Sequence, residues 1–419
     1  MKGFFGGGVW SVQKTPLPLI PECDACGLYK HCQSPRMPVS GLGHRRVLIL
    51  AEGPGYKEDE QGIQLVGLSG QKLAELLDKI DVSLRRDCWL DNAIRCRKTD
   101  ANGDNLEPKD KEIGHCRANL VATLRDYKPE VVIPLGKAGI KAIVALGWKE
   151  GEVDTMGQWA GWTIPCAELN CWICPAYHTS YLMRQKSVAL ELLMLRHLRK
   201  AFSLNRRPWP VQPNWERYVR VEMDPEKAAR DIQVMACSGR PLAFDYETTT
   251  LKPDGPDAEI LCYSVSDGQT SISCPFAGPT AEVLKSLLLS DVPKIACNLK
   301  FEQRWTQKHL KIAVRNWMWD CLLGAHWLNC KRGICGLDFQ AFALLGVGNY
   351  SSYLDPYMQG EGGNGVNKLR QVEPRLLLKY NAADSLFEWN VAMMQMGKIS
   401  FENWRDYVCY GKLAPCHRL

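Results

Sequence analysis

The chain has 419 residues, of which 46% are hydrophobic and 23% charged, and it carries a net charge of +6. This composition is that of a globular protein, and the length predicts two or three domains. No apolar run reaches the roughly 18–20 residues that cross a bilayer. The first residues also lack the apolar stretch of a signal peptide. We therefore expect a cytoplasmic protein with no membrane partner. The mild positive charge is compatible with nucleic-acid binding but does not establish it.

The first half of the chain alternates between predicted strands and predicted helices. Strands are predicted within residues 45–55, 88–96 and 129–136. Helices are predicted within residues 69–80, where Ser69 is the expected N-cap, and within residues 112–127, 138–147 and 186–204. Such alternation is typical of a parallel sheet that is covered by helices on both faces, an α/β fold.

Cysteines are the second feature of the first half. Cys23 and Cys26 form a C-x2-C pair, Cys96 follows a predicted strand, and Cys116 lies within a predicted helix. In a reducing compartment such thiols more often bind metal than form disulfides. The spacing is compatible with an iron–sulfur cluster, with zinc at the same four ligands, or with unrelated core thiols.

Five motifs in this half occur in a characteristic order. They lie at residues 23–32, 49–73, 91–96, 112–116 and 177–184. Together they resemble the family 4 uracil-DNA glycosylases. The resemblance implies an αβα-sandwich domain over residues 1–205, a [4Fe–4S] cluster bound by the four cysteines named above, and excision of uracil from DNA.

The resemblance also implies roles for polar residues at one pocket. Asn92 would read uracil through its amide, which offers both a donor and an acceptor. His178 would donate a hydrogen bond to the uracil anion as it leaves. Glu52 and Asp59 would position water or stabilise positive charge on the sugar. A solvated acid is the alternative for Asp59, and an ordinary loop histidine is the alternative for His178.

The same pocket departs from the family in three places. Gly53 and Gly55 retain the turn that lets the backbone approach the substrate. Ala51 stands where the family usually has Gly, Leu65 where it has the Phe that stacks on uracil, and Thr179 where it has Pro. Loss of an aromatic ring removes roughly 1–3 kcal/mol of base stacking. We expect a weak uracil site, a site with altered base preference, or a module that only binds DNA.

The second half begins after a segment rich in Pro, Trp and Arg, which we interpret as a linker over residues 206–225. A helix is predicted at residues 224–239 and a strand at residues 241–250. A hairpin is predicted at residues 259–276, with its turn at Asp267 and Gly268.

Acidic residues recur at the ends of these predicted elements. Asp245 and Glu247 are two residues apart on a strand, which places both side chains on one face. Glu302 follows in the motif NLKFE. Tyr380 and Asp384 are four residues apart and share a helix face. Carboxylates that converge in this way can bind hard divalent ions, although surface acids on a packed domain remain the alternative.

The three acidic motifs resemble the DnaQ-like 3′–5′ exonucleases, in particular the exonuclease domain of family-A DNA polymerases. The resemblance implies an RNase H-like domain over residues 226–400 and two Mg²⁺ or Mn²⁺ ions about 3.5–4 Å apart. Asp245 would bind both ions, and Glu247 and Asp384 would complete the inner site. Tyr380 would orient the attacking water. Glu302, where the family usually has Asp, would hold the second ion through water.

Two further residues and the end of the chain complete the sequence predictions. Asn298 and Lys300 are expected to steady the substrate near the scissile bond. Residues 401–419 are expected to form a C-terminal helix like the one that leads into a polymerase domain. The combination suggests a virus-encoded protein and a polymerase partner. We therefore predict a DNA exonuclease with weak uracil excision. The alternative is a DNA-binding accessory module, or part of a split family-A polymerase, with one or both sites inactive.

Overall fold

A computed structural model describes residues 21–148, 153, 155–207, 214–360, 362 and 365–399. The chain divides between Trp209 and Pro210 into two compact units, which are described separately below. The predicted C-terminal helix at residues 401–419 and part of the predicted linker lie outside the described residues.

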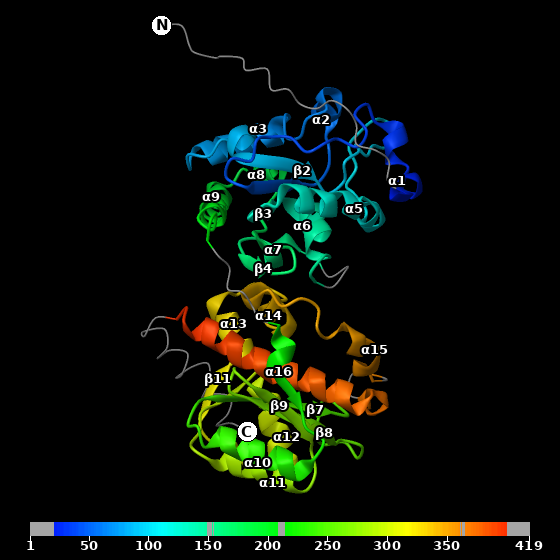
Figure 1. Cartoon of the computed structure of the whole chain (residues 1–419). Coiled ribbons are helices and arrows are strands. Elements are labelled where there is room, and N and C mark those ends of the chain that lie inside the picture. The colour runs from blue at the N-terminus through cyan, green and yellow to red at the C-terminus, as the bar shows by residue number, and fades with distance from the viewer. Residues whose placement is uncertain are drawn as a thin grey trace. The chain divides into compact units, whose positions relative to one another are not determined.

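The first unit is built on a five-stranded sheet (Figure 1). Its strands are β1 (Val47–Ala51), β2 (Cys88–Asn92), β3 (Val131–Pro134), β4 (Ile164–Cys166) and β5 (Cys171–Ile173). They lie in the order β2-β1-β3-β5-β4, and all neighbours are parallel except β4 and β5. Because β1, β2 and β3 run in one direction, the turns that follow them meet at the same edge of the sheet.

Helices cover both faces of this sheet, which confirms the predicted αβα arrangement. The first-unit helices are α1 (Pro21–Cys26), η1 (Leu28–His31), α2 (Tyr56–Gln61), α3 (Leu68–Asp78), α4 (Leu84–Asp87), α5 (Asp110–Tyr127), α6 (Gly136–Val144), α7 (Met156–Trp159), α8 (Thr179–Gln185) and α9 (Val188–Phe202). Leucines of α3, α8 and α9 pack in one core with Val47 and Ile49 of β1. On the other face α6 packs against β1 and β3, and α5 packs against α6.

The start of α3 differs from the sequence prediction. The N-cap is Gly67, so Ser69 lies inside the first turn. The Glu58 carboxylate accepts hydrogen bonds from the backbone N–H groups of Val66 and Gly67, at 3.0 and 2.8 Å. A side chain from another helix therefore fixes the entry to α3, and sequence spacing alone does not reveal such a contact.

The second unit is built on a six-stranded mixed sheet (Figure 1). Its strands are β6 (Val219–Val221), β7 (Leu242–Thr248), β8 (Ile260–Ser266), β9 (Ser271–Pro275), β10 (Lys294–Ala296) and β11 (Trp317–Asp320). The order is β11-β10-β7-β8-β9-β6, with β8 antiparallel to β7 and β9 and the other neighbours parallel. Strands β7 to β11 thus have the order and directions that define the RNase H-like fold.

Helices of the second unit also lie on both faces of its sheet. They are η2 (Trp215–Tyr218), α10 (Pro225–Ala236), α11 (Pro279–Leu289), α12 (Leu299–Leu310), α13 (Cys321–Leu328), α14 (Leu337–Leu345), η3 (Ser352–Leu354), α15 (Asp355–Met358), η4 (Leu369–Gln371) and α16 (Pro374–Met396). Residues of α10, α11 and α12 share one core with the sheet. The long helix α16 crosses the other face and contacts β6 to β10 (Figure 1).

Of two sequence predictions in this unit, one is confirmed and the other is wrong in part. The hairpin is confirmed: β8 and β9 pair antiparallel, and Gly268 at the turn has a φ of +81°. The interpretation of all of residues 206–225 as linker is wrong in part. Residues 215–218 form η2, and residues 219–221 form β6, which pairs with β9. The short alternating run VRV gives too weak a signal for a strand by itself.

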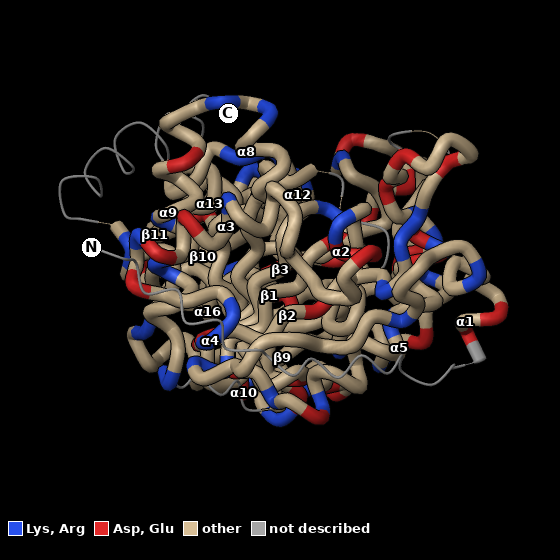
Figure 2. The backbone as a smooth tube through the Cα atoms, turned by 90° about the horizontal axis from the view of Figure 1, so that it is seen from above, with Lys and Arg blue, Asp and Glu red and all other residues tan. Residues whose placement is uncertain are grey.

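Charged residues of both signs are interspersed around α1, α2 and α5 (Figure 2). The chain has a net charge of +6, but the segments around these three helices do not form a continuous stretch of positive charge. Within the described ranges, no helix has both the length and the hydropathy that crossing a membrane would require.

Candidate active sites

Six of the predicted glycosylase residues line one open cleft of about 1360 Å³ in the first unit. They are Glu52, Gly53, Gly55, Leu65, Asn92 and His178. These residues come from the turn after β1, from the end of β2, from the segment before α3 and from the N-cap of α8. The cleft is also lined by Lys57, Lys98 and Arg184, of which Lys57 and Lys98 form ion pairs with Glu60 and Glu112.

Asn92 is the last residue of β2, and its side chain is buried at the wall of the cleft. Its Nδ2 has no hydrogen-bond partner, and its backbone N–H donates to Asp91 Oδ1 at 2.8 Å. An unpartnered buried amide is costly in a folded protein unless a ligand satisfies it. The geometry therefore leaves this amide available to a ligand in the cleft.

His178 is the N-cap of α8, and its ring orientation is fixed by Ser180. The Ser180 backbone N–H donates to Nδ1 at 3.2 Å, and Ser180 Oγ lies 2.8 Å from the same atom. Because Nδ1 accepts a hydrogen bond, the proton of the neutral ring lies on Nε2. Burial lowers the pKa of His178, which favours this neutral form. The residue can thus donate one hydrogen bond from Nε2.

Glu52 is positioned by a glycine that the sequence reading did not single out. Gly136, at the start of α6, has a φ of +73°, and a Cβ added there would lie 2.4 Å from Glu52 Oε1. The same carboxylate oxygen lies 3.5 Å from the Ala138 backbone N–H. Only glycine leaves room for the carboxylate at this place.

The structure does not place Asp59 at the cleft, where its predicted role requires it. Asp59 is 2% exposed and does not line the cleft. Its carboxylate oxygens accept hydrogen bonds from the backbone N–H groups of Gln33 and Ser34, at 3.1 and 2.8 Å. The charged run around Asp59 suggested a solvated or catalytic acid, but the fold places this side chain against the segment that follows η1. The neighbouring Glu58 lines the cleft instead.

Leu65 occupies a constrained backbone position at the base of the cleft. Its φ is +54°, and its side chain is buried in the core of the first unit. The Arg85 guanidinium donates to the carbonyl of Gln64 and, at 3.0 Å, to that of Leu65. Position 70, which adjoins Leu65 in the structure, must be glycine, because a Cβ there would lie 2.0 Å from the Leu65 carbonyl oxygen. These contacts therefore fix the backbone at Leu65, although the side chain there has no aromatic ring.

The four predicted cluster ligands line a second cavity. Cys23 and Cys26 come from α1, Cys96 follows β2, and Cys116 lies on α5. Hydrogen bonds reach two of the sulfurs from the surrounding chain. The Arg36 backbone N–H donates to Cys96 Sγ at 3.3 Å, and Asn119 Nδ2 donates to Cys116 Sγ at 3.5 Å. Such bonds are typical of thiolate ligands.

The four cysteines supply a complete set of thiol ligands around one cavity. Four cysteine sulfurs can bind either a single tetrahedral zinc ion or a [4Fe–4S] cluster. The residues present therefore fit the cluster that the sequence predicts, and they also fit zinc.

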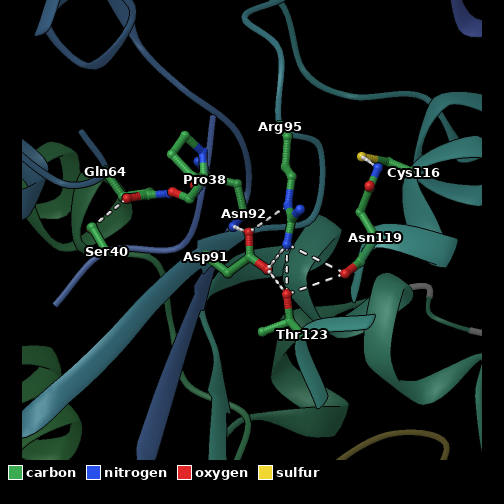
Figure 3. Close-up of polar contacts among 9 residues, drawn as sticks. All are labelled: Pro38, Ser40, Gln64, Asp91, Asn92, Arg95, Cys116, Asn119 and Thr123. Carbon is green, nitrogen blue, oxygen red and sulfur yellow. Dashed lines mark hydrogen bonds and ion pairs between the residues drawn. The ribbon is translucent and has the colours of Figure 1, made fainter. Parts of the chain in front are cut away.

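A buried polar network connects this cavity to the cleft (Figure 3). Arg95 forms an ion pair with Asp91 at 2.7 Å and also donates to the Asn119 carbonyl at 3.3 Å. Thr123 donates to Asp91 Oδ2 at 2.8 Å. Asp91 adjoins Asn92, and Asn119 donates to Cys116 Sγ. Asn92, at the cleft, is therefore linked through this network to the thiol of Cys116.

The second unit brings together three of its predicted acids. Ligand oxygens of Asp245, Glu247 and Asp384 all lie within 4.8 Å of one another. Asp245 and Glu247 share the face of β7 that α16 covers, whereas Phe244 and Tyr246 point into the opposite core. The spacing of two residues on a strand and of four on a helix therefore predicted their convergence correctly.

Three residues hold these acids in place, and the sequence analysis predicted only one of them. Asn381 Nδ2 donates to Asp245 Oδ2 at 2.7 Å, and Tyr350 Oη donates to Asp384 Oδ1 at 2.6 Å. Tyr350 stacks on Tyr380, with ring centroids 6.0 Å apart. Tyr380 was predicted beside Asp384, but Asn381 and Tyr350 were missed. Tyr350 comes from a distant segment without regular structure, and no local pattern marks it.

Burial of several carboxylates in one place changes their ionisation. Burial raises the pKa of Asp245 to about 7. Burial, together with the charge of neighbouring acids, raises the pKa of Glu247 and Asp384 well above the ordinary range. Like charges in a buried cluster are stabilised by protons or by bound cations. The arrangement is that of a candidate divalent-metal site.

The remaining predicted residues surround the start of α12. Glu302 is 1% exposed in its first turn. Asn298 and Lys300 are exposed, and Asn298 has a φ of +71°. Asp320 holds this turn, because its carboxylate accepts from the backbone N–H groups of Asn298 and Leu299 at 3.0 and 3.2 Å.

Solved structures similar to this chain include nucleases at low sequence identity. Escherichia coli RNase D, an exoribonuclease, has a TM-score of 0.34 and 13% identity, with 43% of this chain and 44% of that chain covered. The catalytic core of RRP6 from Trypanosoma brucei has a TM-score of 0.34 and 13% identity, with 42% and 46% covered. This chain therefore spans less than half the length of these two structures.

Sequence relatives match the first unit. The profile of the uracil DNA glycosylase superfamily matches residues 38–203. The type-4 uracil-DNA glycosylase of Pyrobaculum aerophilum is 30% identical over 175 residues, which are 41% of this chain and 85% of that protein. That of Thermotoga maritima is 29% identical over 186 residues, 44% of this chain and 90% of that protein. Through residues 38–203 of its first unit, the chain belongs to the uracil-DNA glycosylase superfamily.

Proposed function

We propose that the second unit removes 3′ nucleotides from DNA by metal-dependent hydrolysis. The observation that carries this proposal is the convergence of Asp245, Glu247 and Asp384 within 4.8 Å on an RNase H-like sheet. Divalent ions bound by these oxygens would stabilise the attacking and leaving oxygens of an in-line displacement. DNA, rather than RNA, is the proposed substrate because the same chain carries a glycosylase-family unit.

The chain's own residues supply the remaining functions. The Asn381 amide donates a hydrogen bond to Oδ2 of Asp245 and so fixes this carboxylate. The other oxygen of Asp245 then remains available to the group of three acids. Burial, and secondarily the neighbouring acids, raises the pKa of Tyr380 well above its usual range. Tyr380 therefore stays protonated and can donate a hydrogen bond to a water or phosphate oxygen beside Asp384.

The proposal is tested with single-stranded oligonucleotides that carry a 3′ label, in DNA and in RNA form. Release of labelled mononucleotide from DNA is expected with Mg²⁺ or Mn²⁺ and not with EDTA. Release from RNA alone would change the substrate class. No release with either metal would instead support a DNA-binding accessory role.

A second activity, uracil excision, is favoured by one observation in the first unit. The buried Asn92 amide has no partner and faces the same cleft as His178, whose Nε2 carries the ring proton. Asn92 would hold the uracil edge, and His178 would stabilise the leaving anion by one hydrogen bond. The cluster would act by holding the segments that carry these residues, since cluster binding is coupled to folding.

Uracil excision is expected to be weak in the natural sequence and stronger in Leu65→Phe. A ring at position 65 restores stacking of about 2 kcal/mol, which corresponds to roughly thirtyfold in rate if it acts wholly in the transition state. The measurement is the formation of abasic sites in single-stranded uracil-containing DNA. Leu68→Phe is the matched control, because Leu68 also lines the cleft but is 70% exposed.

Absence of abasic product from both the natural sequence and Leu65→Phe would refute this second activity. The first unit would then be a cluster-stabilised DNA-binding module. Any product that is observed should disappear in Asn92→Ala, since that change removes the amide proposed to read the base.

A further inference from the structure

Tyr350 lies outside the predicted motifs and yet contacts one of the three acids directly. Its Oη donates a hydrogen bond to Asp384 Oδ1 at 2.6 Å, and both side chains are buried. This bond holds one oxygen of the Asp384 carboxylate, so that the other remains available to the group of three acids. Hydrogen bonds from a neighbouring side chain orient a metal ligand in this way. The orientation of Asp384 therefore depends on what holds Tyr350.

Aromatic rings from two other elements surround the ring of Tyr350. On α16, which also carries Asp384, Phe387 lies edge-on at a centroid distance of 4.7 Å and Tyr380 stacks at 6.0 Å. Trp215, on η2, lies edge-on to Tyr350 at 6.3 Å and to Phe387 at 5.6 Å. Edge-to-face and stacked pairs have preferred geometries, so these contacts restrict how the Tyr350 ring can turn.

Trp215 is itself held in place by contacts with α16 and with its own segment. The Lys379 ammonium, from α16, lies 5.7 Å from the centroid of the Trp215 ring and 2.6 Å from the Glu216 carboxylate. Asn214 caps η2 by accepting a hydrogen bond from the Glu216 backbone N–H at 3.2 Å. Strand β6, which follows η2 directly, pairs with β9. The segment that precedes the central strands of the sheet is thus fixed against the helix that carries Asp384.

We propose that Trp215 is a positioning residue of the acid site, because it holds Tyr350 where the tyrosine hydroxyl fixes Asp384. The inference rests on the proposed function of the second unit. It adds η2, the first described element of that unit, to the parts of the chain on which metal binding depends.

An ordinary packing role of Trp215 makes a different prediction. Trp215 is half-buried, and loss of its ring contacts alone would lower the free energy of unfolding without changing the affinity for metal. A positioning role instead requires that the affinity for metal falls, and that it falls only while the Tyr350 hydroxyl is present.

The experiment is a titration of the full chain with Mn²⁺, in which free Mn²⁺ is measured by its electron paramagnetic resonance signal. The relevant binding is that which the natural sequence shows and Asp245→Asn loses. Tyr350→Phe keeps the ring and removes the hydroxyl, and it is expected to weaken this binding by about tenfold. Trp215→Leu is expected to weaken it by no more than Tyr350→Phe does. Trp215→Phe, which keeps a smaller ring, is expected to lose less than Trp215→Leu.

A double variant shows whether Trp215 acts through the Tyr350 hydroxyl. If it does, Trp215→Leu added to Tyr350→Phe should bind Mn²⁺ as Tyr350→Phe does alone, because the two changes remove the same interaction. Trp389→Leu is the matched control and is expected to bind Mn²⁺ like the natural sequence. Trp389 is another half-buried tryptophan of this unit, and its indole N–H donates to the Pro241 carbonyl at 2.9 Å.

The outcomes separate this inference from the proposed function. Natural affinity for Mn²⁺ in Trp215→Leu, shown to be folded by thermal unfolding, would overturn the inference and leave the exonuclease proposal intact. An equal loss in Trp389→Leu, or a further loss in the double variant, would do the same. If Trp215→Leu does not fold, Trp215→Phe replaces it in both comparisons, and natural affinity there would decide against the inference. Absence of any Mn²⁺ binding that Asp245→Asn removes would overturn both proposals.

Discussion

Asp245→Asn is expected to abolish the release of 3′ nucleotides, with a loss on the order of a thousandfold or more. A metal ion supplies several kcal/mol of transition-state stabilisation, and about 4 kcal/mol corresponds to a thousandfold in rate. The asparagine oxygen can still accept the hydrogen bond that Asn381 donates to Asp245. The loss would therefore come from the carboxylate charge and not from a collapsed site. Asp384→Asn should have an effect of the same order, because its oxygens belong to the same group.

The measurement is the rate of mononucleotide release from 3′-labelled DNA in saturating Mg²⁺. Asp254→Asn is a suitable control, because Asp254 is an exposed acid of the same unit that pairs with Arg304. Thermal unfolding should show that all variants are folded. Activity close to that of the natural sequence in either Asp245→Asn or Asp384→Asn would exclude the assigned site.

Loss of the cluster is the second large effect that we expect. The purified protein should be brown and contain about four irons per chain, and Cys96→Ser should lose most of this iron. Because binding of the cluster is coupled to folding, the first unit should also be destabilised. A loss of about 3 kcal/mol would lower the unfolding midpoint by roughly 6–12 °C for a unit of this size.

Iron content by elemental analysis and thermal unfolding test this expectation together. Cys32→Ser is the informative control. Cys32 lies close to Cys96, but it does not line the cavity that the four proposed ligands share. Retention of iron in Cys32→Ser and loss in Cys96→Ser and Cys116→Ser would support the ligand set. One zinc per chain and no iron would instead keep the four ligands and exclude the cluster.

Local sequence patterns predicted the elements that carry the sites. The two-residue spacing of Asp245 and Glu247 placed both on one face of β7, and the four-residue spacing of Tyr380 and Asp384 placed both on one face of α16. Periodicity of this kind depends only on backbone geometry, which is the same in every strand and helix. The turn at Asp267 and Gly268 was predictable for the same reason, since a positive φ at Gly268 is a local requirement.

Predictions failed where burial and distant contacts decide the role of a residue. Asp59 lies in a run of charged residues that is indistinguishable from a solvated or catalytic segment, yet it is buried against Gln33 and Ser34. Ser69 has the chemistry of an N-cap, but Glu58 fixes the start of α3 two residues earlier. Residues 219–221 become a strand only because β9 offers an edge on which they pair.

The sequence by itself determined the two α/β units, the four thiols that share a cavity and the three acids that converge. It could not show that Tyr350 and Asn381 hold those acids, because each is ordinary in its local context. Only the tertiary structure decided which carboxylate oxygens accept hydrogen bonds and which have no partner. Pairing depends on segments that are far apart in the chain, and a buried carboxylate without a partner exists only once those segments have packed.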